Sequence, residues 1–532
     1  MQTISANVLK LILLISLSSL SLAFGEDIAK PPASSRCAQD HEALSGEWPV
    51  VGLDYFNSRV NLQEKKINIR NVSSLKKKWG RINHEMGGSA VHSQLTIDGK
   101  MTYAADTGGN VFALNAHTGE VIWKTRIGDQ QTFVTSPTIT KKTLFISGSK
   151  LYSIDRKNGR IRWQTPLYDA GQFCDQCSSN TTVVGNRVIV GVGTTSPSAA
   201  FRGAVIAFNK KTGKKVWEFF TTSDQTQPSP QFGAGHGVLS TPAIDIKNSV
   251  VYVGTGHAYN GVAGPLSNAL LAIDLNNGKL LWSYQFKEGD VIDPSKISSE
   301  DNFSGHNVNS HPNLFTVKTP TGLLDLVGIG CNDGSYRIFK REQTNAAAVQ
   351  SLIHLKLDPE AFLPGAVISA IVDNGVLYLS SSAFLDESGN RVSLNYAEFP
   401  PTLAQTSLKT LALDLRTLMN AGNTEGAIPR NSILWEKFTS PGIAISNSLT
   451  LANGVLYQTS WTGFIRALDA RTGEELWRDI PLPIASPSYP FPAPIVGGAT
   501  VVNGKVYVGL GYERYEKVLP GGGVVVYDLP KN

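Results

Sequence analysis

One short phrase is repeated along this 532-residue chain: Asp or Asn, two variable residues, Thr or Asn, Gly, three residues and then Trp. Five clear copies occupy residues 115–123, 155–163, 209–217, 274–282 and 469–477. Each copy follows a short apolar run, and the Asp or Asn and the Gly are residues that favour a tight turn. A repeat of about 40–50 residues, built from short strands and tight turns, is typical of a β-propeller.

Eight such units can be counted, and they predict an all-β, eight-bladed propeller. Besides the five clear copies, two degenerate units lie at about 308–356 and 366–438, and the last lies at about 493–528. The last unit has no fourth strand of its own, whereas residues 72–79, which end in Trp79, look like such a strand. We therefore expect the start of the chain to pair with its end and remove exposed sheet edges. A seven-bladed ring is the alternative.

Three long insertions interrupt the repeat at about 218–238, 257–268 and 283–307. They are rich in Ser, Asn, Gly and Pro, which is the composition of loops. Long loops of a propeller gather on one face. We therefore expect these three segments to build one wall of a pocket at the mouth of the central channel.

The N-terminus has the pattern of a targeting segment. Residues 11–22 form an apolar run that follows Lys10 and precedes small residues. The run is too short to span a bilayer and is typical of a secretory signal peptide. We expect a signal peptide over residues 1–25, an N-terminal extension over 26–71 and a single propeller over 72–532. The protein would then be secreted or periplasmic, with no membrane span after cleavage; a retained anchor is the alternative.

Charge and cysteine content indicate which partners and which covalent links to expect. The chain has 48 basic and 43 acidic residues, and its scattered charges predict no nucleic-acid partner. Two of the four cysteines, Cys174 and Cys177, are three positions apart, and we expect them to form a local disulfide in an oxidising compartment. A redox-active pair is the alternative.

Histidine is scarce, with nine in the whole chain, yet several histidines fall where the repeat places channel-lining residues. His92, His236 and His311 stand at or just before an inner strand, and His257 and His306 lie in flanking loops. Imidazoles that converge on a pocket could bind a transition metal or move protons. The alternative is that they hydrogen-bond backbone groups around a wet channel, and the lack of any short ligand spacing favours it.

The repeat, the eight units and the opening sequence GEWPVVGLDYFNSR (residues 46–59) resemble the pyrroloquinoline quinone (PQQ) dependent alcohol dehydrogenases, nearest the polyvinyl alcohol dehydrogenase branch. The resemblance covers about residues 46–528. It implies an exported oxidoreductase that oxidises a small or polymeric alcohol or polyol. It also implies PQQ at the channel mouth, held by calcium and a stacking Trp, with Asp301 as the catalytic residue.

Several cofactor-binding positions of that family differ here. The family's calcium-binding Asn is replaced by His257, residues 191–196 lack the family's Glu, and Val238-Leu239 replaces the stacking Trp. Asn332 stands where a quinone-contacting Lys or Arg precedes Gly. We therefore take His236, His257 and Asn332 as candidate cofactor-binding residues. Two other functions stay open: a non-catalytic scaffold that binds an envelope protein, and an oxidoreductase with a metal bound by His92, His236 and His311.

Overall fold

The computed structural model describes residues 47–82, 89–128, 135–168, 178–193, 202–222, 234–259, 263–292, 306–308, 310–319, 322–343, 348–357, 369–384, 406–440, 449–483, 492–514 and 517–530. The expected signal peptide, Asp301, Cys174 and Cys177 lie outside these residues. Among the residues described, no helix is long and apolar enough to cross a membrane.

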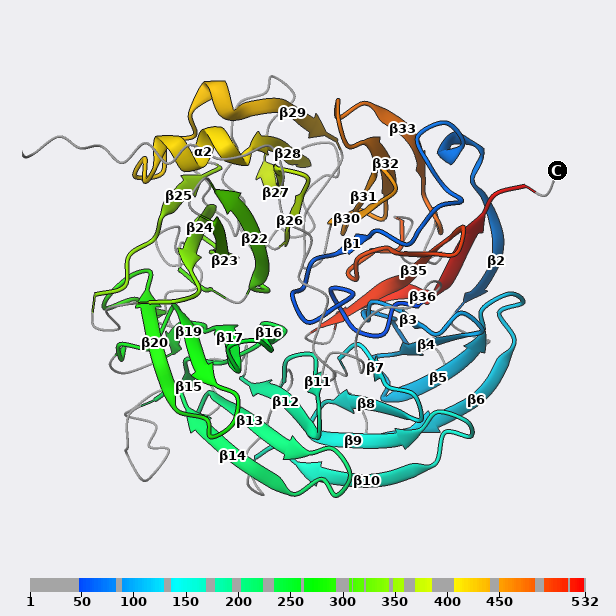
Figure 1. The fold of residues 1–532 in the computed structure, drawn as a ribbon. Helices are drawn as coiled ribbons and strands as arrows, with labels where there is room; N and C mark the ends of the chain where they lie inside the picture. The colour runs from blue at the N-terminus through cyan, green and yellow to red at the C-terminus, as the bar shows by residue number, and fades with distance from the viewer. Residues whose placement is uncertain are drawn as a thin grey trace, which may run out of the picture.

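Eight sheets surround a central axis, which confirms the predicted eight-bladed propeller (Figure 1). Within each of the first seven blades, the strands pair in chain order. The first four blades are β3 (Thr96–Ile97), β4 (Met101–Ala105), β5 (Asn110–Asn115) and β6 (Val121–Arg126); β7 (Thr138–Ile139), β8 (Thr143–Ser147), β9 (Lys150–Asp155) and β10 (Ile161–Pro166); β11 (Thr182–Val184), β12 (Arg187–Val192), β13 (Ala204–Asn209) and β14 (Lys215–Phe220); and β16 (Ala243–Asp245), β17 (Val250–Gly254), β19 (Ala269–Asp274) and β20 (Leu280–Gln285).

The next three blades are β22 (Asn313–Thr319), β23 (Gly322–Gly330), β24 (Ser335–Lys340) and β25 (Ile353–Lys356); β26 (Ser369–Asp373), β27 (Val376–Phe384), β28 (Thr406–Asp414) and β29 (Ile433–Thr439); and β30 (Leu449–Ala452), β31 (Val455–Thr459), β32 (Ile465–Asp469) and β33 (Glu475–Asp479). In the sixth blade, the helix α2 (Leu415–Ala421) and the 3-10 turn η7 (Arg430–Ser432) stand between β28 and β29, and the Asp414 side chain caps the helix by accepting from the Thr417 amide.

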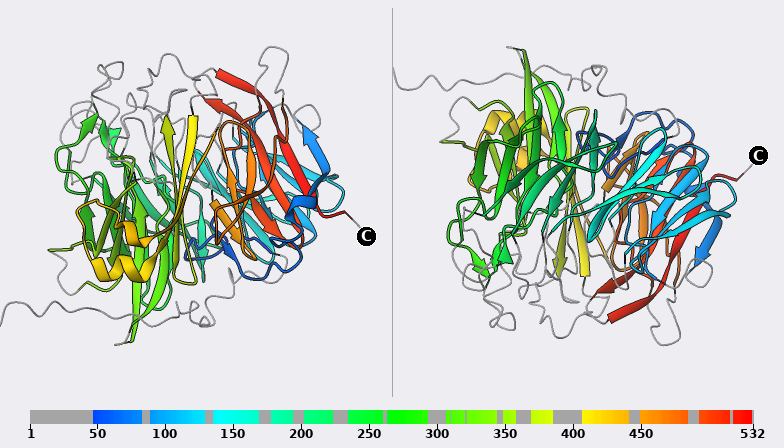
Figure 2. Two further views of the ribbon diagram at one scale, coloured as in Figure 1. Left: turned by 90° about the horizontal axis from the view of Figure 1, so that it is seen from above. Right: turned by 90° about the horizontal axis from the view of Figure 1, so that it is seen from below.

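The eighth blade combines both ends of the propeller. It contains β34 (Thr500–Val502), β35 (Lys505–Arg514) and β36 (Lys517–Asp528), followed by the N-terminal β2 (Lys76–Ile82), which comes after the 3-10 turn η2 (Val72–Ser74). β2 pairs antiparallel with β36, so Lys76 lies opposite Asp528 and Trp79 opposite Val526. The hairpin of β35 and β36, drawn in red, projects beyond its neighbours at one face of the ring (Figure 2).

The two faces of the ring differ. In each of the first seven blades the first and second strands, and the third and fourth, are joined at one face, which we call the turn face. The second and third strands are joined at the opposite face, which we call the loop face. Asn115–Gly119 is an example of a turn-face turn, in which the Asn115 side chain accepts from two amides and Gly119 has φ +73°. The three long insertions leave from the loop face.

The recurring Trp and Gly meet between neighbouring blades. The Trp217 indole of the third blade donates to the carbonyl of Leu275 in the fourth blade at 2.9 Å. Its ring also packs on Gly278, where a Cβ would lie 2.7 Å from Trp217 Cε3. The same contact recurs at four other blade junctions: Trp79 on Gly119, Trp123 on Gly159, Trp163 on Gly213 and Trp435 on Gly473. The phrase that repeats in the sequence is therefore an inter-blade contact.

Residues 48–61, which we call the central segment, run around the axis inside the innermost strands at the turn face. Their backbone and side chains form hydrogen bonds with the innermost strands of seven blades. Trp48 exchanges both backbone hydrogen bonds with Ile97, and β1 (Val60–Asn61) pairs with β30. The central segment therefore covers the turn-face end of the channel, and a ligand for the channel mouth must approach from the loop face.

We predict that Gly278→Ala destabilises the protein by about 2–4 kcal/mol. Gly278 has φ +77°, and the new Cβ would collide with the Trp217 ring. Overpacking and a left-handed conformation both cost free energy. Gly185→Ala is the matched control, because Gly185 has φ +54° and no atom lies within 4 Å of a built Cβ. It should cost about 1 kcal/mol in urea unfolding. Equal costs at the two sites would contradict the role given to the indole contact.

Candidate functional site

The clearest cluster of titratable groups lies on the loop face between the fourth and fifth blades. Asp290 follows β20, His257 follows β17, and His306 precedes β22. Asp290 Oδ2 lies 3.7 Å from His257 Nδ1 and 3.6 Å from His306 Nδ1, and it accepts a hydrogen bond from the His306 amide at 2.8 Å. Asn268 Nδ2 also donates to it at 3.0 Å. One carboxylate is thus held by two imidazoles and two N–H groups.

The insertions position this cluster. Each of the three forms one strand of a small additional sheet on the loop face: β15 (Ala234–Gly235), β18 (Ala258–Tyr259) and β21 (Val291–Ile292). β18 lies in the middle, with His257 just before it, and Asp290 precedes β21. The insertions therefore meet on one face, as the sequence predicted, and their pairing brings Asp290 beside His257.

A second carboxylate lies on the far side of His306. Asp333 Oδ2 is 3.9 Å from His306 Nε2, whereas Asp290 faces Nδ1 of the same ring. Asp333 is fixed by hydrogen bonds from the amide and hydroxyl of Ser335, at 2.9 and 2.6 Å. The His306 imidazole therefore lies between two carboxylates.

Both carboxylates are held ionised. Burial raises the pKa of Asp290, but the facing His257 and His306 rings outweigh burial and hold that pKa well below its usual range. Burial also raises the pKa of Asp333, and the hydrogen bonds from Ser335 again lower it below the ordinary value. Because perturbed carboxylates in a partly open corner are characteristic of functional sites, this cluster is the candidate site.

The candidate cofactor-binding residues surround the same corner. The His236 amide donates to the His257 carbonyl at 2.8 Å, and the Asn332 amide donates to the Asn307 carbonyl at 3.0 Å. Asp290 and Asp333 were not among the residues expected at the site. Asp290 lies in an insertion and matches no position of the repeat. The one sequence signal that could have indicated it is that it is a carboxylate located between His257 and His306 in the chain.

The structure does not group the candidate metal ligands His92, His236 and His311 into one site. His92 and His311 precede the inner strands of the first and fifth blades, which lie on opposite sides of an eight-membered ring. His236 Nδ1 lies 2.8 Å from the Thr221 carbonyl, and its Nε2 accepts from the Gly264 amide at 3.4 Å. Among the described residues, no three His, Cys, Asp or Glu side chains form a group that could hold a metal.

His311 has a different role, which links blades. It stands two residues before its inner strand, and its Nδ1 accepts from the Thr241 amide of the preceding blade at 2.7 Å. The same position in other blades supplies equivalent links: Gln94 N to Ser136 Oγ, Ser136 N to Asn180 Oδ1, and Asn180 Nδ2 to Thr241 Oγ1. The backbone-bonding interpretation of the channel histidines therefore holds for His236 and His311.

The described residues do not fit calcium-held PQQ in the manner that the resemblance implies. Calcium prefers six to eight oxygen ligands, whereas His257 offers nitrogen. A Cβ at Gly191 would lie 2.4 Å from Val238 Cγ1, so this strand end has no room for a carboxylate side chain. Val238 is fully buried and presents no ring for stacking. The carboxylates of Asp290 and Asp333 lie on opposite sides of the His306 ring and cannot share one cation.

We predict that stability falls as the pH decreases below about 6.5, the ordinary pKa of histidine. Burial lowers the pKa of His236 in the folded protein. As the pH falls, this histidine therefore takes up a proton in the unfolded chain before it does so in the folded protein. The contribution of neutral His236 to the free energy of unfolding is complete above about pH 6.5 and is lost as the pH falls toward the lowered pKa. In the His236→Asn variant, the urea concentration at the midpoint of unfolding should depend less on pH between pH 7.5 and pH 5. Asn suits the φ of +56° at this position. An unchanged dependence on pH would contradict the assignment.

Comparison with known proteins agrees with the resemblance. Residues 48–296 match the family described as the glucose/ethanol/alcohol dehydrogenase β-propeller domain, of PQQ type. The polyvinylalcohol dehydrogenase of Sphingopyxis sp. (strain 113P3) is 25% identical over 92% of this chain and 76% of its own length. A polyvinylalcohol dehydrogenase of Pseudomonas sp. is 24% identical over 88% of this chain and 73% of its own length.

Solved structures show the same fold. The quinohemoprotein alcohol dehydrogenase of Comamonas testosteroni superposes with a TM-score of 0.67, at 16% identity, over 94% of this chain and 82% of that one. Such low identity bears on the fold alone. The family match and the two relatives agree with the resemblance that the repeat predicted: the chain is an eight-bladed β-propeller that is similar to the polyvinyl alcohol dehydrogenases.

Proposed function

We propose that this chain is an alcohol-oxidising enzyme in which His306, between Asp290 and Asp333, accepts the proton of the substrate hydroxyl. The observation that carries the proposal is the position of one imidazole between two ionised carboxylates on the loop face. Support also comes from the similarity to polyvinylalcohol dehydrogenases, which extends over 92% of the chain. The substrate class is a small or polymeric alcohol or polyol.

The geometry suits proton transfer. The side chain of His306 is 25% exposed, whereas that of His257 is 7% exposed, so a substrate can approach His306 first. A neutral imidazole takes the hydroxyl proton, and the imidazolium that forms lies between two negative charges. Such positioned general-base catalysis contributes about 10²–10⁴-fold to the rate.

Two amide oxygens provide polar contacts for a hydroxylated ligand. Asn268 Oδ1 and Asn307 Oδ1 are buried and have no hydrogen-bond partner among the described residues. Buried acceptors without partners carry a free-energy cost, which a donor from a bound ligand or water removes. Asn268 bonds Asp290 through its other amide atom, and Asn307 follows His306 directly. A polyol could therefore donate to these oxygens while another of its hydroxyls faces His306.

The oxidant is proposed by class only. Several similar proteins are named quinohemoprotein alcohol dehydrogenases, which supports a quinone as electron acceptor. Because the described residues do not form the calcium and stacking arrangement implied by the family, the proposal covers the proton and assigns no residue to the quinone. The activity test therefore includes incubation with PQQ, both with and without calcium.

A second candidate is a propeller that binds a partner and catalyses nothing. It is favoured by His257 and the buried Val238 at positions where the family has a calcium ligand and a stacking indole. An envelope protein would be a suitable partner for such a scaffold. Absence of quinone binding together with absence of alcohol oxidation would support this second function and exclude the first.

We predict that Asp290→Asn and His306→Gln each lower kcat/KM for alcohol oxidation by about 10²–10⁴-fold. The reason is the loss of the proton acceptor or of a charge that stabilises it. Activity is measured by dye reduction with polyvinyl alcohol and a small secondary alcohol, after incubation with PQQ, with and without calcium. Glu288→Gln is the control, because this exposed carboxylate is only two residues from Asp290 in the chain.

The control should retain wild-type activity, and all variants should unfold at similar urea concentrations. Wild-type activity in Asp290→Asn and His306→Gln would exclude the proposed proton acceptor. A wild-type protein that oxidises neither alcohol under any of these conditions would exclude the proposed enzyme.

We infer further that the chain is exported, on the basis of the apolar run at residues 11–22 and the adjacent small residues. Export would place Cys174 and Cys177 in an oxidising compartment, where a disulfide between them is proposed. Mass spectrometry of the protein from a secreting host should show a mature N-terminus near residue 26 and a mass lower than that of the reduced form by two hydrogen atoms. A full-length chain with free thiols would contradict both proposals.

A further inference from the structure

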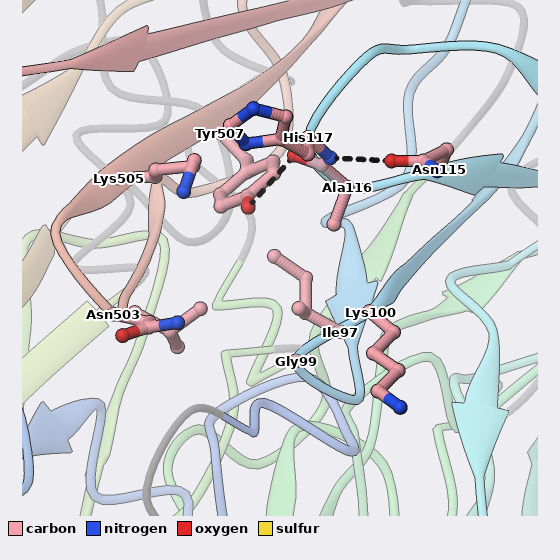
Figure 3. A pocket seen from close by; sticks show the side chains of 10 residues that line it. Ile97, Gly99, Lys100, Asn115, Ala116, His117, Asn503, Lys505 and Tyr507 are labelled. Atoms are coloured by element: carbon pink, nitrogen blue, oxygen red, sulfur yellow. Dashed lines mark hydrogen bonds between the residues drawn. The ribbon is translucent and has the colours of Figure 1, made fainter.

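A hollow opens on the turn face between the eighth and first blades, far from the Asp290 cluster. Its volume is about 380 Å³. It is lined by the turn between β3 and β4, the turn after β5, and the hairpin between β34 and β35 (Figure 3). The side chain of Tyr507 forms part of its apolar floor with Ile97, Ala116 and Val502, all of which are buried.

The equivalent place between the first and second blades is filled by an ion pair. Arg156, the residue directly after the third strand β9, reaches back to the preceding blade and pairs with Asp98. Its guanidinium also bonds the Tyr103 hydroxyl at 3.2 Å and lies 5.3 Å from the centre of the Tyr103 ring. An arginine, an aspartate and a tyrosine therefore close this junction.

The junction between the fourth and fifth blades is closed in a similar way. Arg341, the residue directly after β24, binds Asp245 of the preceding blade at 2.8 Å. The hydroxyl of Tyr252 donates to the Arg341 carbonyl at 3.3 Å. Two junctions thus use the same three residue types at the same positions of the repeat.

At the junction of the eighth and first blades, only the tyrosine remains. The pairing registers align Tyr507 with Tyr103 and Tyr252, because Thr500, Thr96 and Ala243 lie opposite these tyrosines. Two residues after each of those partners come Val502, Asp98 and Asp245. The residue after the third strand is Ala116, where the other two blades have arginine. Both charged partners are replaced by short apolar residues, which leaves the space that the ion pair occupies elsewhere.

The rim of the hollow is basic. Lys100, His117 and Lys505 line it, and none of the lining residues that the structure describes is acidic. Lys505 and His117 lie near each other in Figure 3, and Lys100 lies on the other side of the hollow. Lys505 Nζ lies 3.8 Å from Asp528 Oδ2, which is a long distance for an ion pair, and the Lys505 side chain is only 15% exposed. A partly buried ammonium in this position favours an anionic ligand.

We propose that this hollow, bounded by Val502 and Ala116, is a binding site for a small carboxylate with an apolar body. The carboxylate pairs with Lys505, and Lys100 adds a second positive charge to the rim. The apolar body packs on the Tyr507 ring, Val502 and Ala116. The ligand thus supplies a carboxylate and fills the volume that the side chains of the ion pair occupy at the two junctions described above. This site is separate from the proposed alcohol site, because it lies on the opposite face.

Isothermal titration with benzoate tests the proposal directly. Benzoate should bind the wild-type chain at one site per molecule, and benzyl alcohol, which has the same ring without the charge, should bind at least tenfold more weakly. Lys505→Gln should weaken benzoate binding by about tenfold, the effect of losing one charge-assisted hydrogen bond. Lys211→Gln is the control, because Lys211 is exposed in a turn of another blade, and it should bind as the wild type does.

The double substitution Ala116→Arg with Val502→Asp introduces the arginine and aspartate that close the two junctions described above. This double variant should not bind benzoate, because the new ion pair fills the hollow. Its melting temperature should equal or exceed that of the wild type. Asp290→Asn should bind benzoate normally, which separates this site from the proposed catalytic one. Undetectable benzoate binding by the wild type, or full binding by a folded double variant or by Lys505→Gln, would overturn the proposal.

Discussion

The contact between one blade's indole and the next blade's glycine is the interaction on which the rest of the ring depends. Trp217 lies on Gly278, and its N–H bonds the Leu275 carbonyl beside it. A large apolar side chain contributes much buried area, yet here it also fixes the angle between sheets because the neighbour has no Cβ to displace it. The turn that carries the glycine is itself set by an Asp or Asn side chain. Turn, strand and inter-blade packing are thus specified by one phrase of nine residues.

The repeat made the fold predictable and left most of the site unpredicted. Positions within a blade can be inferred from the phrase, because its Gly and Trp are four residues apart in every clear copy, as at Gly119 and Trp123. The phrase does not show which side chains face one another across the ring. His92 and His311 therefore appeared equivalent in sequence, although they belong to the first and fifth blades. Asp290 lies in an insertion, where no periodicity applies, and only the pairing of β18 with β21 reveals its contact with His257.

The chemically distinctive places of the molecule are those where the repeat is interrupted. Insertions after the third blade, within the fourth blade and after the fourth blade build the small sheet beside Asp290, and His306 follows in the last of these insertions. At the junction of the eighth and first blades, Ala116 and Val502 replace a charged pair and open a hollow. The central segment covers the axis at the turn face, so these two places are separate. A regular ring thus provides stability, and local departures from it provide the polar corner and the hollow.

A double-mutant cycle between Trp217 and Gly278 is the most direct test of the account. Trp217→Leu removes the ring that a new Cβ would strike, so Gly278→Ala should then cost only its backbone strain. We predict that its cost in urea unfolding falls from about 2–4 kcal/mol in the wild type to about 1 kcal/mol in the Trp217→Leu background. The same cost in both backgrounds would show that indole and glycine act independently, and that the ring is held by something other than their contact.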